Sequence, residues 1–233
     1  NYVVLGYLTG EFPPQKRNLF QSWKVMQNFL GAHRAAYQVI HKNYPSAKVS
    51  FSKIVNYFTP ARNWCPLEYF FTKIVHYKWN YYFLSKVKNQ LDYIGFSYYF
   101  HNRIVWHPPF RKNLNKKITD LGWEIYPEGI YYTLKYLAEF KKPIYVLENG
   151  LADAKDSQRK DFIKNHLYWI HRSIREGVDV RGYLHWSLMD NFEWDKGYGP
   201  RFGLIEIDYN TLERKPRSSA FYYAKVCKEN QLI

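Results

Sequence analysis

The sequence has 233 residues, a formal net charge of +14 and 46% hydrophobic residues. This length can bury a substantial core, and the hydrophobic content excludes an intrinsically disordered chain. The basic residues are scattered, no run reaches five like charges, and no nucleic-acid-binding motif is present. We therefore expect a solvated basic surface, or one that faces an acidic partner, and no nucleic-acid partner.

Cysteine usage and the first residues bear on the cellular location. Cys65 and Cys227 form neither a disulfide framework nor a CxxC metal motif, which is typical of reduced thiols in a cytoplasmic protein. Residues 1–8 have no basic flank and are too short for a signal peptide or a membrane span. We expect no membrane association. The absence of an initiator Met suggests a start inside a longer sequence.

Along the chain, hydrophobic spacing predicts alternating helices and strands after a first loop at Pro13-Pro14. A helix is expected from Ser22 until Pro45 stops it. Further helices are predicted over residues 66–86, 127–140, 156–176 and 217–229, and strands over 48–55, 93–99, 143–147 and 180–186. Asp156 and Ser157 are expected to cap the helix that Gly177 closes.

Four apolar strands alternating with amphipathic helices predict an α/β fold with a parallel sheet covered by helices. Tyr99, Glu148 and Trp186 each stand at the C-terminal end of a predicted strand. Ligands bind at these ends both in βα barrels and in open doubly wound sheets. No glycine-rich nucleotide motif occurs, so no cofactor is expected. The eight histidines show no metal spacing and are interpreted as helix-face or surface residues, so no metal is expected.

Longer ordered motifs give a more specific signal. They are LGWEIYPEG at residues 121–129, LENG at 147–150, GYLHWSLMDNFEW at 182–194 and RFGL at 201–204, with Gly6-Tyr7 and Phe12-Pro13-Pro14. With these motifs the chain resembles family 1 glycoside hydrolases, the β-glucosidase and β-galactosidase family, over essentially its whole length. The resemblance implies a (β/α)8 TIM barrel. This chain would supply only the last four βα units, a half-barrel forming a single C-terminal domain of residues 1–233.

The resemblance also implies roles for individual side chains. Glu148 would be the catalytic nucleophile, and Tyr99 would hydrogen-bond its carboxylate. Glu193 would accept hydrogen bonds from the 4- and 6-hydroxyls of the non-reducing sugar. The remaining expected substrate-binding residues are Trp186 and Trp194 around that sugar, Trp123 against the leaving group, Phe202 nearby, and Ser97 near the sugar. Taken singly, each could be a core aromatic or a solvated polar residue, and only the ordered combination favours a site.

The sequence departs from the family pattern in three ways. Leu147 stands where the family usually has Thr, and Ser97 stands where it usually has Asn. The Asn-Glu-Pro motif that carries the family's acid/base Glu is absent, and alignment places it upstream of Asn1. We therefore expect a retaining β-glycosidase of β-glucosides or β-galactosides. The acid/base Glu would come from an N-terminal half-barrel or another partner chain. The open sheet edges would be covered by that half-barrel or by a second copy, as a homo-oligomer. The alternative is an incompetent half-barrel that acts as a sugar-binding or assembly module.

Overall fold

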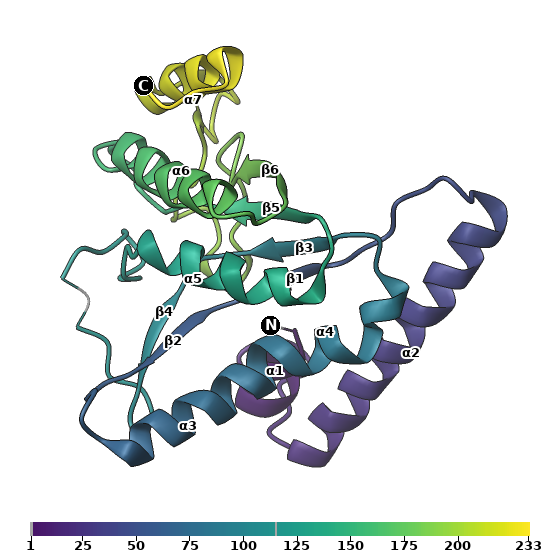
Figure 1. Ribbon diagram of the computed structural model, residues 1–233. Coiled ribbons are helices and arrows are strands. Elements are labelled where there is room, and N and C mark those ends of the chain that lie inside the picture. The colour runs from purple at the N-terminus through teal and green to yellow at the C-terminus, as the bar shows by residue number, and fades with distance from the viewer. Residues whose placement is uncertain (1, 115) are drawn as a thin grey trace.

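A four-stranded parallel sheet forms the centre of the computed structural model, which describes residues 2–114 and 116–233 (Figure 1). The strand order is β1, β3, β5, β6, so neighbours in the sheet follow one another along the chain. Their bounds are β1 (Ser52–Ile54), β3 (Ile94–Ser97), β5 (Ile144–Asn149) and β6 (Val180–His185). Helices connect consecutive strands, which confirms the predicted parallel sheet of four strand–helix units.

The helices begin and end close to the predicted positions. They are α2 (Leu19–Asn43), α3 (Pro66–His76), α4 (Tyr82–Val87), α5 (Glu128–Leu137), α6 (Arg159–Arg175) and α7 (Ser218–Glu229). Helix α2 starts before Ser22 because the Asn18 side chain accepts a hydrogen bond from the Gln21 amide at 2.9 Å. Between α3 and α4 the helix widens into the π-helical turn η2 (Tyr77–Tyr81).

The core lies between one face of the sheet and the helices. Ile94 and Phe96 from β3 and Ile144 and Val146 from β5 are completely buried in it. Leucines from three helices cover them, namely Leu30, Leu84, Leu134 and Leu137. Since every second strand residue points to this face, the alternate residues point to the opposite face.

Part of that opposite face is uncovered in the described residues, and the outer edges of β1 and β6 are unpaired there. Leu184 on β6 is 52% exposed although it is apolar and lies within a strand. Ser52 on β1 is also exposed. Unpaired strand edges and an uncovered apolar face are features that proteins normally shield.

Several short elements were not predicted. Near the N-terminus lie α1 (Tyr2–Val4) and the π-helical turn η1 (Leu5–Thr9). Strands β2 (Tyr57–Pro60) and β4 (His101–Ile104) pair in parallel beyond the sheet, and β7 (Ile205–Ile207) pairs antiparallel with β8 (Arg214–Pro216). The 3-10 turns are η3 (Lys88–Gln90), η4 (Ala138–Phe140) and η5 (Trp194–Lys196).

Two local predictions are wrong. The start of α6 is capped by Asp153, whose Oδ2 accepts hydrogen bonds from the Gln158 and Arg159 amides at 2.7 and 3.0 Å. Asp156 and Ser157 do not cap it. The histidines are not all helix-face or surface residues, because His101 and His185 are buried on strands.

Within residues 2–114 and 116–233, no helix is both long and apolar enough to cross a bilayer.

Candidate active site

The C-terminal ends of β3, β5 and β6 converge around a buried amide. Asn149 ends β5, and its Nδ2 donates to the Tyr98 carbonyl at 2.7 Å, just beyond β3. Tyr183 on β6 donates its hydroxyl to Asn149 Oδ1 at 3.1 Å. The Trp186 amide donates to the Asn149 carbonyl at 3.0 Å. One asparagine thus ties three strand ends together and fixes its neighbour Glu148 between them.

Glu148 and Tyr99, both expected in the site, lie in direct contact. The Tyr99 hydroxyl donates to Glu148 Oε2 at 3.1 Å. Backbone pairing supports this contact, because the Tyr98 amide donates to the Glu148 carbonyl at 3.0 Å. This hydrogen bond restricts the rotation of the Glu148 carboxylate.

Charges at these strand ends are close enough to influence one another. Burial, and then the charge of Glu148, hold the pKa of Tyr99 well above its usual value, so Tyr99 remains a hydrogen-bond donor. Burial raises the pKa of Glu193, and the neighbouring charges of Glu148 and Asp195 raise it further. Glu148, Tyr99 and Glu193 therefore share one electrostatic environment although they come from three segments.

Aromatic rings line the region next to Tyr99. The Trp123 ring centroid lies 5.9 Å from that of Tyr99, 4.7 Å from Phe100 and 6.0 Å from Phe202. Phe202 is only 1% exposed, so it supports Trp123 from behind. Such a partly exposed ring beside Tyr99 suits the apolar face of a sugar or an aryl group.

Trp194 lies apart from this group and meets the N-terminal loop. It is 68% exposed and stacks on Phe12, with centroids 5.8 Å apart and planes 24° apart. The loop after η1 and the loop after β6 are therefore neighbours in space, although about 180 residues separate them. Figure 1 shows the N-terminal segment below β1 and β3, next to α2.

Two positions that depart from the family pattern have local partners. Ser97 is buried, and its hydroxyl lies 3.1 Å from that of Ser52 on the neighbouring strand. Leu147 lies over Gly95, where any Cβ would collide with the leucine side chain. Gly95 thus leaves the space that the larger residue at 147 requires.

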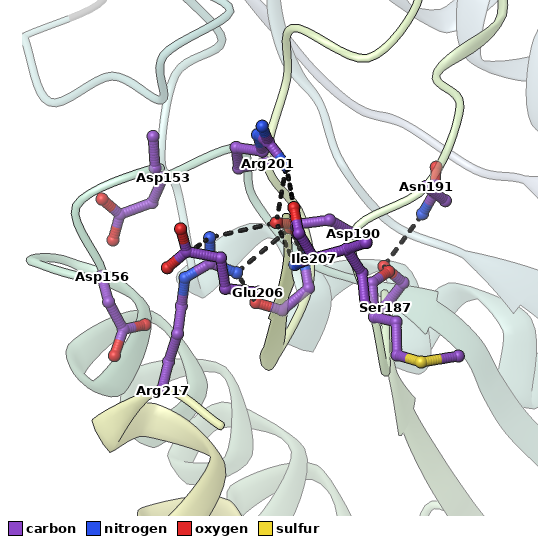
Figure 2. A network of polar contacts seen from close by, with 12 residues as sticks. Asp153, Asp156, Ser187, Asp190, Asn191, Arg201, Glu206, Ile207 and Arg217 are labelled. Carbon is purple, nitrogen blue, oxygen red and sulfur yellow. Dashed lines mark hydrogen bonds and ion pairs between the residues drawn. The ribbon is translucent and has the colours of Figure 1, made fainter. Parts of the chain in front are cut away.

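The loop after β6 is held by a buried ion-pair network around Asp190 (Figure 2). Arg217 donates Nη1 and Nη2 to the two Asp190 oxygens, each at 3.1 Å, and Arg201 donates to Oδ2 at 3.2 Å. The amides of Gly203 and Ile207 also donate to this carboxylate, at 2.8 and 3.4 Å. Asp190 therefore joins the segment carrying Trp186 and Glu193 to the β7–β8 hairpin and to the start of α7.

The sequence analysis did not single out Asn149, Asp190 or Arg217 as functional. Asn149 and Asp190 stand inside quoted motifs, next to or near the expected carboxylates, and that position was the available signal. Arg217 carries no such signal, because 27 residues separate it from Asp190. Across the described part of the chain, no group of three or more His, Cys, Asp or Glu side chains could hold a metal ion.

Comparison with known proteins identifies the family. The family model described as "Glycosyl hydrolase family 1" matches residues 78–232. This chain belongs to glycosyl hydrolase family 1. The match includes all the predicted site residues, from Ser97 to Phe202.

The curated relatives that this chain matches are longer than the chain itself. A beta-galactosidase of Sulfolobus acidocaldarius is 42% identical over 160 residues, which are 62% of this chain and 33% of the relative. A 1,4-beta-D-glucan glucohydrolase of Thermotoga neapolitana is 31% identical over 277 aligned positions. That alignment includes 99% of this chain and 62% of the relative, so the chain spans about three fifths of that enzyme.

Solved structures agree on the fold. The beta-glycosidase from Pyrococcus horikoshii superimposes with a TM-score of 0.92 at 36% identity, covering 100% of this chain and 59% of that one. The beta-glucosidase from Thermotoga maritima in complex with glucoimidazole superimposes with a TM-score of 0.89 at 29% identity. This match covers 99% of this chain and 62% of that one. The four-stranded sheet is thus part of a family 1 TIM barrel, which confirms the expected fold class. The open face of the sheet corresponds to the interior of that barrel.

Proposed function

We propose that this chain is the nucleophile-bearing part of a retaining β-glycosidase that hydrolyses β-glucosides or β-galactosides. The hydrogen bond from Tyr99 to Glu148 at 3.1 Å, at the C-terminal strand ends of a family 1 fold, is the observation that carries the proposal. Residues 1–233 would act as one C-terminal domain of the barrel.

In the first chemical step, a Glu148 oxygen attacks the anomeric carbon and the bond to the leaving oxygen breaks. This leaves a covalent glycosyl-enzyme. The leaving oxygen needs a proton from a second carboxyl group, ~5–5.5 Å from the nucleophile in retaining enzymes. The same group then takes a proton from water, whose oxygen attacks the anomeric carbon and releases Glu148.

Substrate contacts are proposed from the same arrangement. Glu193 would bind the sugar's 4- and 6-hydroxyls, with Trp186 and Trp194 around this subsite and Ser97 near its base. Trp123, supported by Phe202, would stack on the leaving group. Its partly exposed ring beside Tyr99 supports this role.

The acid/base carboxyl is proposed to come from outside these 233 residues, because they contain no Asn-Glu-Pro motif. An N-terminal half-barrel would pair with the free edges of β1 and β6, supply the missing strands and bring this carboxyl. A second copy would cover the same edges without bringing the motif. The same missing motif favours the alternative, a sugar-binding or assembly module without turnover.

Leaving-group dependence separates the two functions. Dinitrophenolate leaves without a proton, whereas an alkoxide does not, and general acid help is worth about 10²–10⁴-fold. A nucleophile-bearing chain alone should cleave dinitrophenyl glucoside and spare methyl glucoside. Adding the missing half should restore alkyl glucoside cleavage. Saturable binding of glucoimidazole with no dinitrophenolate release, with or without that half, would support the alternative.

A further inference from the structure

A hollow of about 530 Å³ lies beside β2 and β4, which pair with each other near the start of α3 (Figure 1). This volume is within the range of small-molecule sites. Arg62 and Arg103 both line the hollow, and no Asp or Glu of the described residues does. The Ala61 amide donates to the Ile104 carbonyl at 2.9 Å. The two arginines, which are the chain neighbours of Ala61 and Ile104, therefore extend from adjacent points of the paired segments.

The carboxylates that pair with these arginines are not part of the wall. Glu68 accepts from Arg62 Nε at 2.8 Å and from the Arg62 amide at 2.7 Å, and its side chain is completely buried. Glu124 accepts from Arg103 Nη1 with both oxygens, at 3.0 and 2.8 Å, and its side chain is 9% exposed. Neither carboxylate lines the hollow. Each guanidinium is thus held by an acid outside the hollow, which restricts its orientation.

His101 is a second donor to Glu124. Its Nδ1 lies 2.9 Å from Glu124 Oε2, and because a carboxylate only accepts, Nδ1 carries the proton. Burial, and then the charge of Arg103, lower the pKa of His101 to about 4, so the ring is neutral at pH 7. Its Nε2 therefore accepts from the Thr59 hydroxyl at 2.9 Å. The Glu124 carboxylate is consequently paired with two side chains and leaves part of Arg103 free.

Both guanidinium groups keep N–H groups that have no partner within the described chain. Arg103 uses only Nη1, which leaves Nε and Nη2. Arg62 uses Nε and Nη2, which leaves Nη1. None of these three nitrogens is among the unpaired polar atoms that are sealed from solvent, so a ligand can reach them. The two side chains are 18% and 39% exposed, respectively.

Free guanidinium N–H groups favour an oxyanion as their partner. Each arginine–carboxylate pair is neutral as a whole, but the net charge of +14 attracts anions to the chain from a distance. The Trp64 ring is 77% exposed and lies 5.4 Å from the Arg62 guanidinium, so an apolar surface adjoins the donors.

We propose that this hollow binds an organic oxyanion, an aromatic carboxylate or phosphate ester. Its acid group accepts hydrogen bonds from Arg62 and Arg103, and its ring lies against Trp64. A bare inorganic ion would fill only a small part of the volume. This inference does not depend on the proposed glycosidase function, since no residue that lines the hollow belongs to the candidate active site.

The test titrates the purified protein by calorimetry with benzoate and with phenyl phosphate, and with benzamide as a neutral ring shaped like benzoate. At least one anion should bind saturably and about tenfold more tightly than benzamide, and the tighter anion identifies the acid group. Arg62→Lys and Arg103→Lys keep the charge and the carboxylate partner but remove the planar fork. Each should weaken that anion about tenfold and leave benzamide unchanged. Arg181→Lys on β6, exposed and paired with Asp179, is the matched control and should bind like wild type.

Thermal unfolding without ligand separates lost binding from unfolding. Because lysine can still pair with Glu68 or Glu124, both variants should melt close to the wild-type temperature. Equal anion affinity in wild type, Arg62→Lys and Arg103→Lys would overturn the proposal. An equal loss in Arg181→Lys would also overturn it, by showing attraction to surface charge alone. Displacement of the anion by millimolar glucose would place it in the candidate active site and refute a separate hollow.

Discussion

The Asp190–Arg217 pair makes the sharpest prediction about stability. The Asp190 side chain is fully buried and the Arg217 side chain is 6% exposed, and two hydrogen bonds of 3.1 Å join them. Arg217→Met keeps the aliphatic volume and removes the charge. Breaking a buried ion pair by removing one partner costs about 3–5 kcal/mol. Arg201 and two backbone amides still stabilise the Asp190 carboxylate in this variant. We therefore expect the free energy of unfolding to fall by about 3 kcal/mol, the lower end of that range.

The assay is urea unfolding at pH 7, followed by circular dichroism, for the wild type and two variants. Lys225→Met is the matched control, since its ion pair with Glu229 is exposed and 3.9 Å long. Such surface pairs contribute about 0–1 kcal/mol. If Arg217→Met lost no more stability than Lys225→Met, the buried network would not hold the loop that carries Glu193. The reasoning about this part of the site would then be refuted.

The other predictions concern the site and the pH dependence of stability. Tyr99→Phe should slow dinitrophenolate release about 10²-fold, by analogy with the loss of one preorganised hydrogen-bond donor in other enzymes. An unchanged rate would show that Tyr99 does not assist the nucleophile. Trp123→Ala should raise KM for aryl glucosides more than for alkyl glucosides, and a uniform effect would argue against stacking on the leaving group. Burial lowers the pKa of His166 to about 4, so its neutral form favours the fold. The contribution of His166 to the free energy of unfolding should be complete above pH 6.5 and decline by up to ~1.4 kcal/mol per pH unit towards pH 4. His166→Gln should flatten that decline in urea unfolding at pH 7, 5.5 and 4.5, and an unchanged slope would contradict this cause.

Strong periodicity made the main elements predictable from the sequence. The four sheet strands and the helices of the repeating units followed from apolar runs, amphipathic spacing and prolines such as Pro45 and Pro127. Short elements such as β2 and β4 could not be found this way. They are only four residues long, and each depends on the other for its hydrogen bonds.

Long-range polar pairing limited what the sequence could reveal about the site. The contact between Glu148 and Tyr99 was expected from the family resemblance, and the structure places these two residues in contact. The role of Asp153 as the cap of α6 was missed because Asp156 and Ser157 stand closer to the helix and have equally suitable side chains. Arg217 was missed because an arginine in a basic surface segment and a buried ion-pair partner look alike in sequence.

The central claim is that the Glu148 carboxylate attacks an anomeric carbon. A 2-deoxy-2-fluoro glucoside with a dinitrophenolate leaving group tests this most directly, because the fluorine slows both steps and the leaving group preserves the first. The covalent sugar therefore accumulates on the nucleophile. Mass spectrometry of the digested protein should find one sugar per chain on the peptide containing Glu148, and none in Glu148→Gln. A label on another carboxylate, or no label with or without the proposed N-terminal half-barrel, would contradict the account.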